Sequence, residues 1–226
     1  MELMKAGVII VGAGSSQRMG GVDKIFALID GKPLLAHAIE AFEVCAEVSQ
    51  IVLVLNEDNL NEGMKLTQEK GYLKVTGAYH GGLRRQDSVA EGLKRLEGCE
   101  WIIVHDGARP CVTPTLIEHG LREAAETGVA IAAVPAKDTI KAIGADMMVQ
   151  ETLPREALWM VQTPQFFWAD IIKDAYRRMN DNVTDDATLV EALGYRVKVF
   201  WGSYDNIKVT TPEDLTLAEI ILRSRG

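Results

Sequence analysis

Near its start the chain has a short β-branched run that leads directly into a loop of small residues. Val8-Ile9-Ile10-Val11 is followed by Gly12, Ala13 and Gly14, and the loop continues with two serines. A strand without polar alternation is typical of a parallel sheet that helices cover on both faces. Because small residues leave backbone N–H groups uncovered, such a loop can surround an anion. The stretch therefore predicts an α/β fold with an anion site after its first strand.

Two cations, Arg18 and Lys24, follow this loop and indicate a phosphate-rich ligand. The dinucleotide fingerprint G-x-G-x-x-G is incomplete, because Gln17 stands in place of its third glycine. The P-loop pattern G-x-x-x-x-G-K-[ST] is also missing. A Rossmann oxidoreductase is therefore the least favoured interpretation. The alternative without function is a strand and turn whose two cations are simply solvated.

Apolar runs and amphipathic segments alternate through the first two thirds of the chain. The pattern predicts further strands at 50–55, 73–75, 101–104, 129–135 and 196–200. It predicts helices at 33–46, 59–70, 87–96, 115–127, 169–179 and 185–193, with a last one opened by Thr211-Pro212-Glu213-Asp214. Such alternation gives right-handed crossovers and a mostly parallel sheet. We expect one domain over residues 1–226, a Rossmann-like three-layer sandwich of the α/β class.

Composition excludes several classes of function. The net charge of −8 argues against a general binder of nucleic acid or anionic membranes, which usually carry basic surfaces. Three widely spaced cysteines fit reduced thiols in a cytosol, and neither a disulfide framework nor a zinc site. No apolar run approaches the ~20 residues of a membrane span, and the N-terminus has no signal-peptide pattern. The cytoplasm is the expected location.

Two further loops carry candidate ligand-binding residues. The first, at 77–86, contains Arg84 and Arg85, which either assist binding or lie solvated at the start of the next helix. The second, at 105–110, follows a predicted strand and holds Asp106 and Arg109. Ligands of open parallel sheets bind beyond the carboxyl ends of the strands, so this loop should face the same crevice as the first one. The alternative is an Asp–Arg ion pair that braces the loop, and His105 is expected to be structural.

The pattern changes between residues 136 and 160. Residues 138–141 and 149–153 alternate polar and apolar positions around Gly144-Ala145-Asp146, which predicts a two-stranded ribbon. An isolated hairpin is at best marginally stable in water, so we expect this arm to pack on another surface. A flap on a monomer is the alternative.

Taken together, these segments resemble the 2-C-methyl-D-erythritol 4-phosphate cytidylyltransferase family, nucleotidyltransferases of isoprenoid precursor synthesis. The matching segments run in order over nearly the whole chain: 14–24, 81–88, 105–110, 138–141, 163–167, 184–185 and 205–210. Two positions depart from the family pattern. Ser16 stands where the family usually has a second glycine, and Asp23 where it has a proline before the lysine.

The resemblance implies that CTP and 2-C-methyl-D-erythritol 4-phosphate react to 4-diphosphocytidyl-2-C-methyl-D-erythritol and pyrophosphate, with Mg²⁺ bound mainly through the CTP phosphates and no metal ligand from the protein. It places Arg18 and Lys24 at the α-phosphate, and Arg155 and Lys208 at the acceptor phosphate. The nucleotide pocket is expected to comprise Gly12, Ala13, Gly14, Ser16, Gly82, Ser88 and Gly107. The acceptor is expected to contact Asp106, Arg109, Thr139, Arg155, Thr184 and Lys208.

The resemblance also implies a homodimer in which the arm carries Thr139 and Arg155 into the partner's active site. Residues 163–167 are expected to be scaffold, and the paired acids after Thr184 to serve a helix N-terminus. Three alternatives stay open: a cytidylyltransferase for another polyol phosphate such as ribitol 5-phosphate, a guanylyl- or uridylyltransferase, and a nucleotide-binding module without turnover. The presence of four candidate phosphate-binding cations argues against the last.

Overall fold

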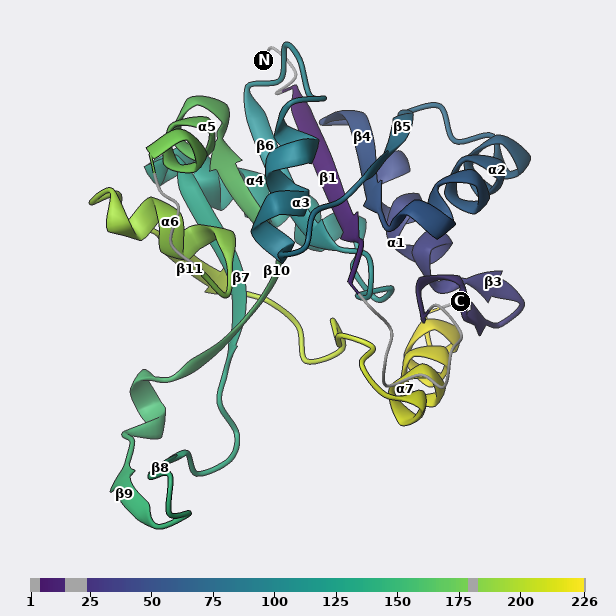
Figure 1. Cartoon of the computed structure of the whole chain (residues 1–226). Helices are drawn as coiled ribbons and strands as arrows, with labels where there is room; N and C mark the ends of the chain where they lie inside the picture. Colours follow the sequence, from purple (N-terminus) through teal and green to yellow (C-terminus); the bar gives the residue numbers. More distant parts are fainter. Residues whose placement is uncertain (1–4, 15–23, 179–182, 226) are drawn as a thin grey trace.

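The computed structural model describes residues 5–14, 24–178 and 183–225. Its centre is a seven-stranded sheet in the order β11-β7-β10-β6-β1-β4-β5 (Figure 1). These strands are β1 (Ala6–Gly12), β4 (Val48–Leu55), β5 (Val75–His80), β6 (Trp101–Asp106), β7 (Val129–Pro135), β10 (Trp159–Trp168) and β11 (Lys198–Trp201). Strand β10 is antiparallel to both of its neighbours, and the other pairs are parallel. The predicted mostly parallel α/β sheet is confirmed.

Helices cover both faces of the sheet (Figure 1). One face carries α1 (Leu34–Glu43), α2 (Leu60–Lys70) and α4 (Pro114–Thr127), and the other carries α3 (Arg85–Leu93), α5 (Ala169–Arg178) and α6 (Asp186–Ala192). Alternate residues of a strand belong to opposite layers, as Ile9 and Ile10 do in β1. Helix α7 (Pro212–Arg223) packs beside the sheet on a small ribbon of β2 (Leu28–Ile29) and β3 (Lys32–Pro33). The described residues also form three short 3₁₀ helices: η1 (Lys24–Phe26), η2 (Glu57–Asn59) and η3 (Arg155–Ala157).

Strand β10 was not predicted, because a proline within a run argues against a central strand. The structure accommodates Pro164 where the pairing of β10 with β7 is interrupted, between Val161 and Gln165. The aromatic pair that follows lies in the core as predicted, with Phe166 and Phe167 fully buried on opposite faces. Residues 163–167 are therefore both scaffold and strand.

Other boundaries also differ from the prediction. The third strand is β5, not residues 73–75, so the first four residues of the predicted loop at 77–86 are paired with β4; Leu73 is 91% exposed. Helix α3 begins two residues earlier than predicted, and β6 extends through Asp106. The N-cap of α6 is Asp185 rather than Thr184, because the Asp185 carboxylate accepts from the Thr188 N–H at 3.2 Å. The predicted cap of α7 at Thr211 is confirmed.

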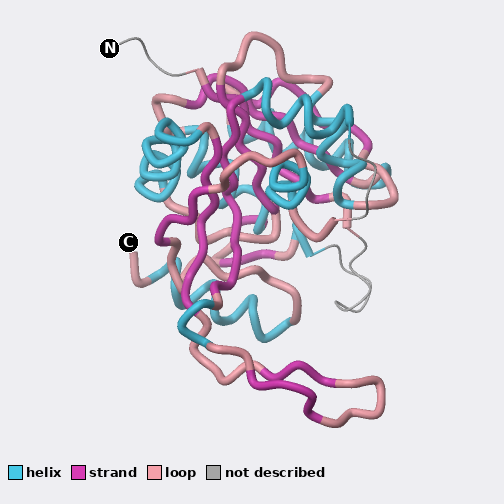
Figure 2. Tube along the Cα trace, turned by 90° about the vertical axis from the view of Figure 1, so that its left-hand side faces the viewer, coloured by secondary structure: helices cyan, strands magenta, loops and turns pink. Residues whose placement is uncertain are grey.

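The arm consists of β8 (Lys141–Ile143) and β9 (Val149–Thr152), paired in an antiparallel ribbon as predicted. It extends well away from the main sheet (Figures 1 and 2). Its tip exposes the apolar side chains of Ile143, Met147, Met148 and Val149. Apolar side chains that face water on a thin ribbon indicate a surface that another body covers.

The three cysteines, Cys45, Cys99 and Cys111, are free and buried. Within the described ranges, no helix has the length and apolar character needed to cross a membrane.

Candidate active site

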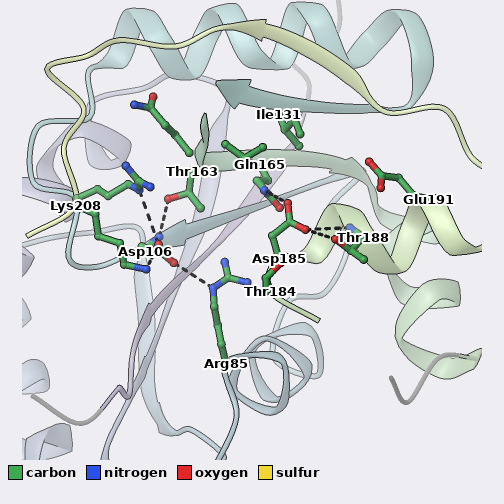
Figure 3. A pocket seen from close by; sticks show the side chains of 13 residues that line it. Arg85, Asp106, Ile131, Thr163, Gln165, Thr184, Asp185, Thr188, Glu191 and Lys208 are labelled. Carbon is green, nitrogen blue, oxygen red and sulfur yellow. Dashed lines mark hydrogen bonds and ion pairs between the residues drawn. The ribbon is translucent and has the colours of Figure 1, made fainter. Parts of the chain in front are cut away.

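Two cavities meet at the carboxyl ends of β1 and β6. The larger, about 420 Å³, lies between the end of β6, the middle of β10 and the start of α6 (Figure 3). The smaller, about 200 Å³, lies where β1 ends, and its wall includes Gly14 and Lys24. Arg85, Asp106 and Lys208 line both cavities. These three side chains are therefore the wall that the two cavities share.

Asp106 is the centre of this wall. Its carboxylate lies 2.7 Å from Lys208 Nζ, 3.2 Å from Arg85 Nε and 3.8 Å from Arg109 Nε, and its side chain is 10% exposed. Burial alone would raise the pKa of Asp106, but the charges of Arg85 and Lys208 outweigh it and hold the pKa below its ordinary value. Asp106 is therefore ionised at neutral pH. Arg85 also pairs with Asp186, so three cations face two carboxylates, and this cluster keeps one net positive charge for an anionic ligand.

His105 supports this wall from behind. Its Nε2 lies 3.1 Å from the Arg109 carbonyl, and its Nδ1 lies 3.2 Å from Thr163 Oγ1, which also accepts from the Asp106 N–H at 3.0 Å. Burial lowers the pKa of His105 to about 4, so the ring is neutral at pH 7. A neutral ring with both nitrogens engaged agrees with the structural role expected from the sequence.

The two glycine-bearing loops approach one another at the smaller cavity. A Cβ on Gly81 would lie 2.5 Å from Ala13 Cβ and 2.6 Å from Ser88 Oγ, so only glycine permits this contact. Ser88 is buried in the first turns of α3, and its hydroxyl accepts from the Gly82 N–H at 3.1 Å. The structure therefore brings Ala13, Gly82 and Ser88 together near the end of β1.

The remaining nucleotide-site candidates divide into two groups. Gly107 lies against β1, with its N–H donating to the Val11 carbonyl at 2.8 Å. Ser16, Arg18 and Asp23 lie outside the described residues.

The arm residues are not part of this site within one chain. Thr139 and Arg155 are exposed and line neither cavity. Arg155 Nη1 donates to the Lys137 carbonyl at 2.9 Å, so the guanidinium lies along the base of the arm. By contrast, Arg109 and Thr184 line the larger cavity with Asp106 and Lys208.

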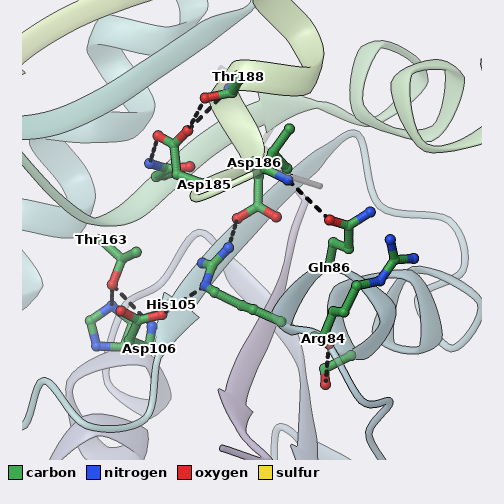
Figure 4. A network of polar contacts seen from close by, with 12 residues as sticks. Arg84, Gln86, His105, Asp106, Thr163, Asp185, Asp186 and Thr188 are labelled. Atoms are coloured by element: carbon green, nitrogen blue, oxygen red, sulfur yellow. Dashed lines mark hydrogen bonds and ion pairs between the residues drawn. The ribbon is translucent and has the colours of Figure 1, made fainter. Parts of the chain in front are cut away.

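Sequence analysis left open or missed several polar residues in and beside the larger cavity. Arg85 is half-buried and forms ion pairs with Asp106 and Asp186, whereas Arg84 is the solvated arginine, paired with Asp87. Asp186 lies at the predicted helix terminus as the first residue of α6, but the sequence did not show that it is fully buried against Arg85 at 2.7 Å (Figure 4).

Gln165 is also fully buried, and its side chain donates to Asp185 at 2.8 Å. Because Pro164 argued against a strand here, the strand that places Gln165 in the cavity was not predicted. For Asp186, a signal was present in the sequence, because two adjacent carboxylates exceed what one helix terminus needs for its cap.

Among the described residues, one group of three side chains has metal-ligating atoms close together: Cys45, Glu47 and Glu118. Cys45 and Glu47 lie just before β4, at the amino edge of the parallel strands. This group is therefore at the opposite edge of the sheet from the two cavities.

Comparison with known proteins gives a consistent result. The sequence model of the family described as 2-C-methyl-D-erythritol 4-phosphate cytidylyltransferase (IspD) matches residues 6–224. A protein of that name from Dehalococcoides mccartyi is 52% identical over 219 residues, which cover 97% of this chain and 96% of the relative. Another from Halalkalibacterium halodurans is 43% identical, covering 98% and 99%.

Solved structures agree with this. The crystal structure of 4-diphosphocytidyl-2C-methyl-D-erythritol synthase from Anaerococcus prevotii matches with a TM-score of 0.86 and 30% identity, covering 96% of this chain and 98% of that one. The 2-C-methyl-D-erythritol 4-phosphate cytidylyltransferase from Thermus thermophilus matches with a TM-score of 0.77 and 32% identity, covering 97% and 100%.

Proposed function

This chain belongs to the 2-C-methyl-D-erythritol 4-phosphate cytidylyltransferase family and is a nucleotidyltransferase, and we propose that it transfers the cytidylyl group across the wall of Arg85, Asp106 and Lys208. CTP binds in the smaller cavity, and the polyol phosphate binds in the larger one. The observation that carries this assignment is that the same three side chains line both cavities. A group that passes from one substrate to the other must cross such a shared wall.

The reaction needs no general base from the protein. A phosphate monoester is largely dianionic near pH 7, since its second pKa is about 6, so its oxygen can attack the α-phosphorus directly. The bond to the β-phosphate breaks as the new one forms, and pyrophosphate leaves. The difficulty is electrostatic, because two polyanions meet while charge accumulates at phosphorus. Fixed cations and backbone N–H groups directed at that charge provide the stabilisation.

Each cation has a distinct role in this proposal. Lys24 lines the smaller cavity and, with Arg18, stabilises the α-phosphate during transfer. Lys208, whose side chain is 40% exposed, is held by Asp106 at 2.7 Å and exchanges part of this ion pair for the acceptor phosphate. Asp106 and Arg109 then orient the polyol, whose hydroxyls donate to the ionised carboxylate. Thr184 contacts the acceptor from the start of α6.

We propose that Mg²⁺ enters with CTP, held mainly by its phosphate oxygens, and neutralises charge on the triphosphate. Among the described residues on the wall of the smaller cavity, the one acid is Asp106, whose carboxylate already accepts from Arg85 and Lys208. This donor set fits a cation carried by the substrate better than one held by a cluster of carboxylates.

We propose further that the protein is a homodimer in which the arm places Thr139 and Arg155 at the partner's larger cavity. The exposed apolar tip of the arm supports this, as does the exposed Trp159–Trp201 pair near its base, with ring centroids 4.9 Å apart.

Subunit complementation tests the homodimer. At acceptor concentrations well below the wild-type KM, Arg155→Ala and Lys208→Ala are each expected to have little activity, but mixed heterodimers have one intact site. Random mixing then restores about a quarter of wild-type activity, since about half of the dimers are mixed and each has one working site of two. No recovery after verified subunit exchange contradicts the placement of Arg155 in trans.

We also propose three broader properties of this protein. Residues 1–226 form one nucleotidyltransferase domain, with its arm at about 136–160. The three free, buried cysteines support a location in the cytoplasm. The net charge of −8 supports small-molecule substrates rather than nucleic acid or a membrane surface.

The proposed function is tested by pyrophosphate release with Mg²⁺ and each of CTP, GTP, UTP and ATP, combined with methylerythritol phosphate or ribitol phosphate. Release that is fastest with CTP and methylerythritol phosphate is the expected result. Preference for ribitol phosphate would keep the chemistry and change the acceptor. Binding of CTP without release from any pair would contradict the proposed reaction.

A further inference from the structure

Asp186, the first residue of α6, is a fully buried carboxylate to which the proposed reaction gives no role. One oxygen accepts from Arg85 Nη1 at 2.7 Å, and the other accepts from the Tyr176 hydroxyl at 2.5 Å. A buried charge is costly unless it is paired and hydrogen-bonded, and here both oxygens are engaged. The arrangement therefore has a defined geometry, which suits the positioning of other groups.

Arg85 extends this contact to the wall of the active site. Its side chain, 24% exposed, reaches from α3 with Nη1 on Asp186 and Nε on Asp106, the latter at 3.2 Å. Burial would lower the pKa of Arg85, but the two carboxylates outweigh it and raise the pKa, so the guanidinium stays charged. Hydrogen bonds and ion pairs thus run without interruption from the Tyr176 hydroxyl on α5 through Asp186 and Arg85 to Asp106 on β6.

The connected elements are opposite walls of the larger cavity. Asp106 ends β6 on one side, and Thr184 lines the other side just before α6. Asp185 is fixed in turn by Gln165, whose side chain donates to it at 2.8 Å. The separation between Asp106 and Thr184 is therefore set by how firmly the start of α6 is held to Arg85.

We propose that Tyr176, Asp186 and Arg85 form a bridge that positions the α6 wall against Asp106 and thereby determines affinity and selectivity for the polyol phosphate. This role rests on the placement of the acceptor in the larger cavity. Tyr176 and Asp186 do not touch the substrate; they are positioning residues that act through Arg85 and Thr184. Neither lines the smaller cavity, and Arg85 keeps its contact with Asp106 there, so CTP binding should depend on them less than acceptor binding does.

Two variants test the bridge. Asp186→Asn removes the charge that Arg85 contacts, and Tyr176→Phe removes a single hydroxyl while leaving every charge in place. Asp186→Asn is expected to raise KM for methylerythritol phosphate about tenfold, and Tyr176→Phe about threefold, because hydrogen bonds to charged groups are stronger than neutral ones. The KM for CTP should change less than about twofold in both. The matched control is Asp174→Asn, the same change on α5 at a carboxylate paired with Arg177 and Arg178 near the surface.

Selectivity gives a readout that general destabilisation does not move. A loosened α6 wall accommodates a longer polyol, so the ratio of kcat/KM for methylerythritol phosphate over ribitol phosphate should fall in both variants and stay constant in the control. Equal changes in both KM values, or an unchanged selectivity ratio in folded Tyr176→Phe and Asp186→Asn, would overturn the bridge.

Lys208→Ala separates this inference from the proposed function. If Lys208→Ala raises KM for the acceptor and the bridge variants do not, the bridge alone is refuted. If Lys208→Ala also leaves that KM unchanged, the acceptor does not bind in the larger cavity, and the proposed function and the bridge fail together.

Discussion

Replacing Asp106 by asparagine should destabilise the protein as well as impair catalysis. Asparagine has nearly the same shape, but it removes the charge that faces Lys208, Arg85 and Arg109 at 2.7, 3.2 and 3.8 Å. Lys208 is 40% exposed and can turn to water, and Arg85 keeps Asp186. Arg109 is 11% exposed and loses its charged partner. Breaking a buried pair costs about 3–5 kcal/mol, so we expect about 3 kcal/mol, the lower end of that range.

The effect is measured as the shift of the thermal midpoint. For a chain of this size, about 3 kcal/mol corresponds to a fall of roughly 6–12 °C. The control is Asp58→Asn, which makes the same change at an exposed carboxylate and should shift the midpoint by less than about 2 °C. The pKa of Asp106 is lowered in the folded protein, so its contribution is present above the unfolded value of about 3.9 and is lost only as pH falls below it. The difference between wild type and Asp106→Asn should therefore be constant from about pH 5 to about 8. Equal midpoints for Asp106→Asn and wild type would refute this account of the wall.

Three further predictions concern other parts of the molecule. Lys24→Ala should lower kcat/KM for pyrophosphate release roughly 30- to 1,000-fold, or about 2–4 kcal/mol, as for the loss of one donor to a charged transition state; activity within a few-fold of wild type would remove its assigned role. Gly120→Ala should lower the free energy of unfolding by about 1–2 kcal/mol although alanine favours helix, because its Cβ would lie 2.1 Å from the buried Phe166 ring; urea unfolding that shows a gain would contradict this packing. The pKa of His105 is lowered to about 4, so the unfolded state binds more protons than the folded state below about pH 6.5. As the pH falls toward about 4, the free energy of unfolding of the wild type should therefore decrease by up to about 1.4 kcal/mol per pH unit more steeply than that of His105→Gln. Parallel curves of urea midpoint against pH for the two proteins would exclude a buried neutral His105.

The sequence allowed the sheet to be predicted where strands are apolar throughout. The runs in β1 and β7 are buried on both faces, and a pattern of that kind has few other solutions. The positions of β5 and β10 were not predicted correctly, because these two strands depend on pairing with their neighbours in the sheet. Strand β10 contains Pro164, and β5 contains Gly77, so each has a residue that local propensity counts against a strand. Both segments are strands because they pair with other strands, and those partner strands lie far away in the sequence.

The residues of the candidate site also differ in whether their local sequence allowed them to be predicted. Asp106 and Lys208 lie in segments that were recognised, and the fold brings them to 2.7 Å. Arg85 and Asp186 are 101 positions apart, and neither has a local pattern that reveals the other. A buried ion pair of this kind becomes visible only when the helices that carry it are placed. Arg155 is the opposite case, because its segment was recognised while its position in one chain lies outside the cavities.

The central claim is that the two substrates occupy different cavities on either side of one charged wall. The most direct test is to measure the Kd for CTP in the presence of Mg²⁺ and the KM for methylerythritol phosphate in the Lys208→Ala variant. The account predicts a Kd for CTP within about threefold of wild type and a KM for the acceptor raised by about tenfold or more. Weakened CTP binding with an unchanged KM for methylerythritol phosphate would contradict it.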